Sequence, residues 1–98
     1  MSAKLQQFAG GYFHEDYKVE FPSPDAAVGA FVTEFSEETV AAVLSEIDDL
    51  LASSMSEAEL YQLWINQLGA AYDPSSDGIT YREWFAHVRD LLSRPPAG

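Results

Sequence analysis

The stretch that decides the fold is residues 36–53, SEETVAAVLSEIDDLLAS. Five apolar residues recur in it at intervals of three and four, which places them on one face of an α-helix. They are Val40, Val43, Leu44, Ile47 and Leu51. Ser36 is a preferred N-cap residue, and Glu37 and Glu38 in the first turn interact favourably with the helix dipole. The sequence therefore predicts a helix over residues 36–53 that buries one face.

The face of this helix opposite the apolar residues is acidic and otherwise small. It carries Glu38, Ser45, Asp49 and Ala52. Glu46 and Asp48 lie on its two flanks. We expect this face to stay exposed and to give the helix a negatively charged surface.

The residues that follow carry a second helix start. Ser56 and Glu59 form a capping-box pattern, and Gly69 supplies the left-handed conformation that ends many helices. A helix is therefore predicted from residue 56 to about residue 68. Its inner face consists of Leu60, Leu63, Trp64 and Leu68.

The last helix repeats this arrangement, with Thr80 and Glu83 as its capping box. Its predicted inner face consists of Trp84, Phe85, Val88, Leu91 and Leu92. Pro95 and Pro96 are expected to end the helix, because proline cannot continue one. Two i,i+4 pairs are predicted on the exposed side, Glu83 with His87 and Asp90 with Arg94.

The first third of the chain has weaker signals. The SPD sequence at residues 23–25 reads as a cap with proline at the first helical position, and it starts a helix through Phe35. Residues 3–10 are expected to form a short helix that closes at Gly10 and Gly11. Residues 17–21 alternate between apolar and charged side chains, which predicts an extended connector.

The composition fits one compact domain. The chain has 98 residues, of which 47% are apolar and none is cysteine, so packing must stabilise it without disulfides or thiolate metal sites. With the helix signals, this predicts an all-α fold, a compact single-domain bundle of four to five helices over residues 1–98. No apolar run is long enough for a signal peptide or a membrane span, which predicts a cytoplasmic protein.

The net charge of −11 is unevenly distributed. Residues 15–59 hold twelve of the sixteen acidic side chains and one lysine, whereas residues 60–98 are nearly neutral. Such a field repels nucleic acids and anionic membranes and attracts a basic partner. The charge therefore argues against direct binding to nucleic acid or membrane, while an acidic surface that only confers solubility stays an open alternative.

Residues 73–84, DPSSDGITYREW, resemble the start of a calcium-binding loop. Asp73, Ser75, Asp77 and Gly78 occupy the first, third, fifth and sixth positions, but Glu83 comes one residue too early for the bidentate ligand that closes such a loop. We therefore predict a tight turn rather than a metal site.

Residues 12–17, YFHEDY, place a histidine and two acids between aromatic residues, a combination that a general acid–base site could use. The other histidine, His87, is far along the chain, and no ligand set has zinc-binding spacing. The favoured interpretation is that His14 and Asp16 satisfy backbone groups. Motifs for nucleophiles and phosphate loops are absent, as is the Asp-Ser-Leu tripeptide of acyl carrier proteins. We expect no catalytic residues, no cofactor and no metal, and hence not an enzyme.

This combination resembles the small helical immunity proteins of bacterial contact-dependent growth inhibition systems. The matching pieces are YFHEDY, the acidic middle helix, the capped helix SEAELYQLW and the ending YDPSSDGITYREWFAHVRDLL, which together run from about residue 8 to residue 92. The family's recurring positions are interpreted as architectural. They are Tyr12, Phe13, His14, Asp16, Tyr72, Asp73, Pro74, Gly78 and Trp84.

The resemblance implies a bacterial cytosolic protein that binds and neutralises the toxic C-terminal domain of a cognate surface effector. Many such domains are nucleases, and an acidic surface can block a cationic active-site cleft. We expect a monomer before toxin binding. We place the partner-binding residues on exposed faces, at Glu34, Glu37, Glu38, Glu46, Asp48, Asp49 and Tyr61. The alternative is an acidic nucleic-acid mimic or adaptor that binds a different basic protein.

Overall fold

Capping residues fix where most of the helices begin. The computed structural model describes residues 3–93, and every regular element in that range is helical, which confirms the all-α prediction. The α-helices are α1 (Ala3–Tyr12), α2 (Tyr17–Glu20), α3 (Pro24–Glu34), α4 (Glu37–Ala52), α5 (Glu57–Tyr61) and α6 (Tyr81–Ser93). A π-helical segment, η1 (Gln62–Gln67), continues α5, and a 3₁₀ turn, η2 (Pro74–Asp77), precedes α6.

The predicted N-caps are confirmed at four helices. In each, a Ser or Thr oxygen accepts a hydrogen bond from the backbone N–H three residues later. These caps are Ser23 for α3, Ser36 for α4, Ser56 for α5 and Thr80 for α6. At α5 and α6 the carboxylate of the Glu three residues after the cap accepts a hydrogen bond from the backbone N–H of the cap residue, which completes both predicted capping boxes. Gly69 follows η1 with a φ of 76°, as predicted for a helix stop.

The predicted end of the first helix is wrong, because α1 continues through Gly10 and Gly11 to Tyr12. Burial of Phe8 and Tyr12 in the core holds this extra turn in place. A Cβ atom at Gly10 would lie 3.1 Å from the carbonyl oxygen of Leu68. Gly10 therefore permits close approach of another segment and does not end the helix.

The predicted extended connector is also wrong, since Tyr17–Glu20 forms the single helical turn α2. The Val19 N–H donates to the Asp16 carbonyl at 2.9 Å, and Phe21 N–H donates to the Tyr17 carbonyl at 2.7 Å. Tyr17 is buried, whereas Val19 is 86% exposed. The alternation of apolar residues reflects a short turn with one anchored ring, so the two-residue period does not mark a strand here.

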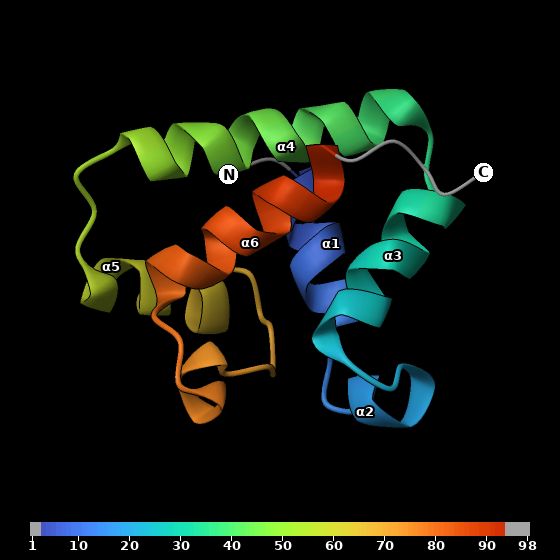
Figure 1. Ribbon diagram of the computed structural model, residues 1–98, viewed down its shortest axis with the longest axis horizontal. Coiled ribbons are helices and arrows are strands. Elements are labelled where there is room, and N and C mark those ends of the chain that lie inside the picture. The colour runs from blue at the N-terminus through green and yellow to red at the C-terminus, as the bar shows by residue number, and fades with distance from the viewer. Residues whose placement is uncertain (1–2, 94–98) are drawn as a thin grey trace.

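The core lies between α4 and the remaining helices. Figure 1 shows α4 along one side of the molecule with α6 crossing beneath it; α3 packs against α6, and α1 packs against α4 and α3. The largest fully buried rings are Trp64, Trp84, Phe8, Phe13, Phe31 and Phe85. They meet mostly edge to face, as in the 5.6 Å contact between the Trp64 and Trp84 rings.

The buried face of α4 is rotated slightly from the predicted one. Val40, Val43 and Ile47 are buried as predicted, but the fourth buried position is Leu50. Leu44 and Leu51 are half-buried and lie at the edge of the core. The outer face is exposed as predicted, at Glu38, Ser45, Asp49 and Ala52.

Two charged side chains join α5, the end of α4 and the start of α6. The Glu57 carboxylate accepts the backbone N–H groups of Tyr81 and Arg82, at 2.7 and 3.0 Å. The Arg82 guanidinium in turn donates to the carbonyls of Leu51, Ser53 and Met55, at 2.9, 3.3 and 2.9 Å. These bonds satisfy terminal backbone groups of both helices and fix the direction of α4 relative to α6.

Near the C-terminus, His87 does not follow the predicted pairing. His87 Nε2 lies 2.8 Å from Asp25 Oδ1 of α3, while Glu83 bonds the cap of its own helix. The predicted stop at Pro95 and Pro96 and the predicted pairing of Asp90 with Arg94 lie outside the described residues. Within residues 3–93, no helix is both long and apolar enough to cross a membrane.

Candidate functional site

The acidic residues of α4 form ordered rows along its exposed side. Two rows run parallel, each with the i, i+4, i+7, i+11 spacing of one helix face and with an acid at each end. The inner row consists of Glu37, Ala41, Leu44 and Asp48, and the outer row consists of Glu38, Ala42, Ser45 and Asp49. At about 1.5 Å per residue, the two acids of a row are roughly 16 Å apart along the axis. Four of the seven predicted partner-binding residues therefore lie on one regular surface.

The two aspartates stand at the electrostatically unfavourable end of the helix. Asp48 and Asp49 belong to the C-terminal part of α4, where the helix dipole is negative and where no basic residue lies in the last turn. Arg82 offsets part of this cost by binding carbonyls at and beyond the end of α4. Two adjacent carboxylates at this end are not explained by helix stability.

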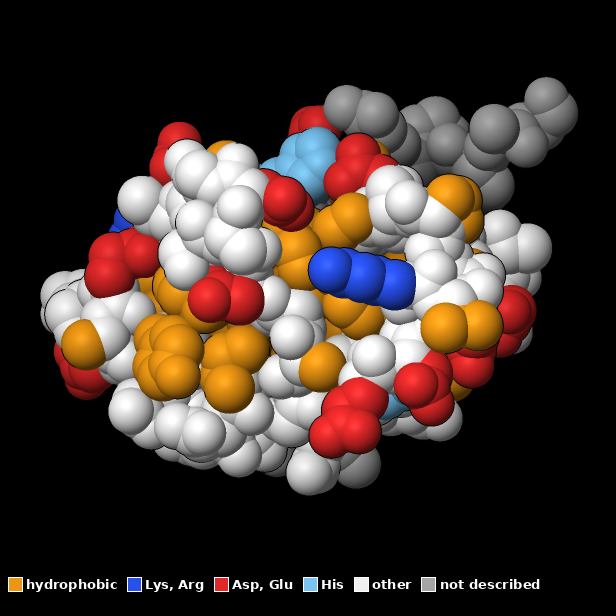
Figure 2. All heavy atoms as spheres, turned by 90° about the horizontal axis from the view of Figure 1, so that it is seen from below, with side chains coloured by type: hydrophobic (Ala, Val, Ile, Leu, Met, Phe, Trp, Pro, Cys, Tyr) orange, Lys and Arg blue, Asp and Glu red, His pale blue; other side chains and the backbone are white. Residues whose placement is uncertain are grey.

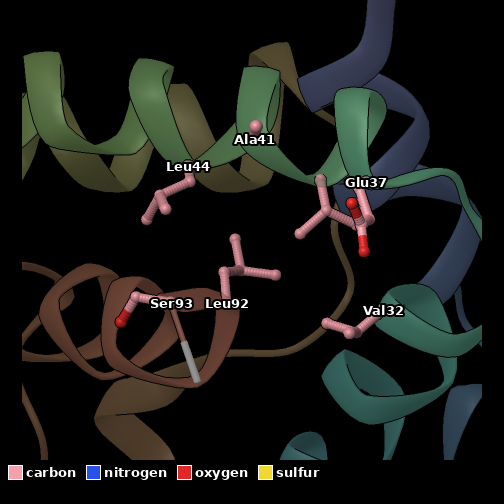
Figure 3. A pocket seen from close by; sticks show the side chains of 7 residues that line it. Val32, Glu37, Ala41, Leu44, Leu92 and Ser93 are labelled. Atoms are coloured by element: carbon pink, nitrogen blue, oxygen red, sulfur yellow. The ribbon is translucent and has the colours of Figure 1, made fainter. Parts of the chain in front are cut away.

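Beside the inner row, α3, α4 and α6 enclose an apolar groove of about 310 Å³. Its lining is Val32, Glu37, Val40, Ala41, Leu44, Leu92 and Ser93. In Figure 3 the Leu44 and Leu92 side chains extend into the space between α4 and α6, with Val32 approaching from α3. The Glu37 carboxylate lies at the α3 end of the groove, so an apolar depression has a negative charge at its rim.

On the other flank of α4, Glu46 and Asp49 share a shallower hollow of about 280 Å³. Its remaining lining is Leu50, Ser53 and Met55. Glu46 is half-buried, whereas Asp49 is exposed. The hollow thus combines two carboxylates with apolar atoms, a combination that suits a long basic side chain.

The other predicted partner-binding residues have individual settings. Asp48 Oδ1 lies 3.6 Å from Arg89 Nη1 of α6. Glu34, at the end of α3, accepts a 2.5 Å hydrogen bond from the Tyr12 hydroxyl. Tyr61 is 40% exposed on α5, where its ring meets that of Tyr81 edge to face. The structure brings the α4 acids together, places Glu34 just before them in the chain, and leaves Tyr61 on a separate helix.

Acidic side chains also occur away from α4. Figure 2 shows the opposite side of the molecule, where red acidic groups are scattered among apolar and uncharged ones. The order of the acids on α4, and the two depressions that flank it, therefore distinguish this helix more than its charge does.

Polar side chains in the two sequence motifs, residues 73–84 and 12–17, form hydrogen bonds within the fold. Asp73 accepts bonds from the Ser75 hydroxyl and the Tyr81 hydroxyl, at 2.6 and 2.7 Å, and these bonds lower the pKa of its carboxyl. Gly78 has a φ of 79°, which confirms the predicted turn. Among residues 3–93, no three His, Cys, Asp or Glu side chains gather in a way that could hold a metal ion.

In the YFHEDY motif, His14 Nδ1 accepts a bond from the Asp16 backbone N–H at 3.1 Å, and its Nε2 lies 3.3 Å from Glu20. The motif closes the junction between α1 and α2, which confirms that His14 satisfies a backbone group. The same prediction is wrong for Asp16, which stands at the N-cap of α2 without a side-chain cap bond. The Tyr12 and Phe13 rings beside it are buried.

The groove was not found by sequence reasoning. Its walls come from three helices, and the sequence predicts that Leu44 and Leu92 lie on buried faces. The signal that was available is the width of the apolar stripe on α4: with Leu44 and Leu51 added to four buried positions, it exceeds what one packed face needs.

Comparison with known proteins shows similarity to a protein family and to a solved structure. A family model described as CdiI immunity protein matches residues 2–92. The chain is also similar to a chain in the crystal structure of a CdiA-CT/CdiI complex from Y. kristensenii 33638, with 27% sequence identity and a TM-score of 0.86. That similarity covers 92% of this chain and 96% of the other. No curated protein matches the chain. The family match includes all of α4 and nearly all of α6.

Proposed function

Because the chain belongs to the CdiI immunity protein family, we propose that it binds the toxic C-terminal domain of a cognate contact-dependent growth inhibition effector and blocks it. The family match over residues 2–92 is the observation that carries this proposal. The similar chain comes from a complex of CdiI with CdiA-CT, which supports a toxin domain as the partner.

The contact surface in this proposal is the exposed side of α4. Its two rows present Glu37, Glu38, Asp48 and Asp49 from a helix whose direction is held by the Glu57 and Arg82 bonds. A rigid array of charges loses little conformational entropy when it binds. The aspartates at the C-terminal end reduce helix stability, and a role in recognition gives a reason for their presence.

The toxin in this proposal is a nuclease with a cationic substrate cleft. A cleft that binds phosphates presents Lys and Arg side chains, and carboxylates spaced along α4 complement such a surface. Occupation of the cleft by α4 would exclude the nucleic acid by competition. The same charges would speed the encounter of the two proteins through long-range attraction.

The test is coexpression with the toxin domain encoded next to this protein. We expect the two chains to copurify, cells carrying both to survive, and added nucleic acid to compete with this protein for the toxin. Failure of the chains to bind would contradict the proposal. Binding and rescue without competition would retain the immunity function but move the contact away from the cleft. If the protein does not rescue cells from the neighbouring toxin but captures a different basic protein, the adaptor alternative is favoured.

A further inference from the structure

The groove between α3, α4 and α6 has the features of an anchor pocket in a protein interface. Its walls are the apolar side chains of Val32, Leu44 and Leu92, one from each helix. The carboxylates of Glu37 and Asp48 end the inner row that runs along it. Protein interfaces concentrate binding free energy where a large side chain fills such a pocket and a polar rim excludes water.

The lining favours a protein side chain over a small molecule. The cavity of about 310 Å³ is at the lower limit for ligand pockets, roughly 300–1,000 Å³. Its polar groups are the Glu37 carboxylate and the Ser93 hydroxyl, and that hydroxyl already donates to the Asp90 carbonyl at 3.0 Å. Few directional groups are left to orient a metabolite, whereas an apolar side chain needs none.

Charge argues against a second copy of this chain as the occupant. Each copy carries a net charge of −11, so two copies repel one another. Asp48 also retains capacity for a new cation, because the 3.6 Å separation from Arg89 is longer than the roughly 2.7–2.9 Å of a charge-assisted hydrogen bond. The occupant should therefore bring a positive charge together with its apolar group.

We propose that this groove receives an apolar side chain of the toxin, that Glu37 at its rim binds a Lys or Arg flanking that side chain, and that Asp48 at the far end of the inner row binds a second basic residue. The inference rests on the proposed function and deepens it. It makes the inner row of α4 the part of the surface that selects the cognate toxin, since a toxin without this apolar and basic combination leaves the groove unfilled.

The first test fills the groove. Ala41 is exposed at its mouth, so Ala41→Phe adds a ring there without removing a buried side chain. Ala58→Phe adds the same ring to an exposed alanine of α5 and is the matched control. We expect Ala41→Phe to raise the Kd for the toxin by roughly tenfold or more and Ala58→Phe to leave it within about twofold. Thermal unfolding of both variants verifies that they fold.

The second test separates charge from shape. Glu37→Gln should raise the Kd for the toxin by about fivefold. The increase in Kd should be smaller for a toxin in which the Lys or Arg that faces Glu37 is replaced by Met. Glu15→Gln removes an equal charge from the α1–α2 junction and should leave the Kd for both forms of the toxin unchanged. A benzophenone amino acid at position 41 should crosslink to a toxin peptide that contains an apolar residue next to Lys or Arg.

The outcomes distinguish this inference from the proposed function. If the unmodified protein fails to bind the toxin, both are overturned. If it binds and Ala41→Phe folds with an unchanged Kd, the groove assignment is overturned while the immunity function stands. Crosslinking from position 41 to a second copy, or to residues 94–98 of the same chain, would also overturn the assignment.

Discussion

At the scale of single residues, Arg82 is the side chain on which the joint between α4 and α6 depends most. Its guanidinium donates to the Leu51 carbonyl in the last turn of α4 and to the Ser53 and Met55 carbonyls beyond it. A hydrogen bond from a charged donor contributes about 1.5–3 kcal/mol to the free energy of unfolding, and removal of the donor leaves its carbonyl acceptors without that partner. We expect Arg82→Met to lower the free energy of unfolding by about 2 kcal/mol, as measured by chemical denaturation.

Arg89→Met is the control for this prediction. Arg89 contacts Asp48 at a largely exposed position, where an ion pair contributes about 1 kcal/mol or less. An equal loss in the two variants would show that Arg82 acts as an ordinary surface charge.

Tyr12 gives the protein a specific response to alkaline pH. Burial, and then the bond to Glu34, raise the pKa of the Tyr12 phenol to about 12 from an ordinary value near 10. A raised pKa in the folded state means that the stabilisation is complete below about pH 10 and is lost as the pH rises through about 12. We expect Tyr12→Phe to unfold with a weaker pH dependence across this interval, as followed by denaturation at a series of pH values. Identical profiles for the two proteins would contradict the assignment.

Residue by residue, the sequence predicted contacts that close within a few positions. The caps at Ser36, Ser56 and Thr80 needed only the N–H three residues later. The sequence did not predict the hydrogen bonds of Glu57 and Arg82, because their partners lie 24 to 31 residues away and depend on how the helices are packed. Glu57 lies in the first turn of α5, but its carboxylate caps the start of a different helix, α6.

At the scale of elements, the two acids that end the outer row of α4 have opposite effects on the stability of the helix. Glu38 is in the first turn and Asp49 is in the last, where a negative charge is favourable and unfavourable respectively, each by about 0.3–1 kcal/mol. We expect Glu38→Gln to lower the free energy of unfolding and Asp49→Asn to raise it, as measured by thermal and chemical denaturation.

The same two variants should change toxin binding in one direction. Both remove a charge from the outer row, so both should slow association with the toxin in stopped-flow or surface-binding measurements. Asp49→Asn would then be more stable but less active. A destabilised Asp49→Asn variant, or association rates equal to that of the unmodified protein, would contradict this account of α4.

Helix periodicity predicted the long elements well and the short ones poorly. The start of α4 and its outer face were correct because sixteen residues carry a regular pattern. The single turn α2 was missed since four residues with one anchored ring look the same as a strand. The extension of α1 through two glycines was missed because tertiary packing overrides the intrinsic cost of glycine in a helix.

At the scale of the whole molecule, net charge should control how fast this protein meets its toxin. Raising the ionic strength from about 0.01 M to 0.15 M shortens the screening length from roughly 30 Å to 8 Å. We expect the association rate to fall by about tenfold or more over this range, with a much smaller change in the dissociation rate. A salt-independent association rate would mean that the −11 charge serves only solubility.

Which surface is a depression is a property of the assembled molecule. The sequence identified the acidic face of α4, but it gave no means of knowing that α3 and α6 approach the inner row without covering Ala41 and Leu44. The groove is bounded by residues of three helices, and no local pattern encodes where three helices leave a space between them.

The edge-to-face contact of Trp64 and Trp84 has a practical consequence for spectroscopy. Their indoles lie 5.6 Å apart at an angle of 64° and are 0% and 1% exposed. Two chromophores at this distance and inclination couple through their transition dipoles, which gives a paired signal in near-ultraviolet circular dichroism. Since the sequence contains no other tryptophan, that signal reports the arrangement of the core alone. It therefore provides an optical criterion for an intact interior in any variant of the α4 surface, measured on this protein without the toxin.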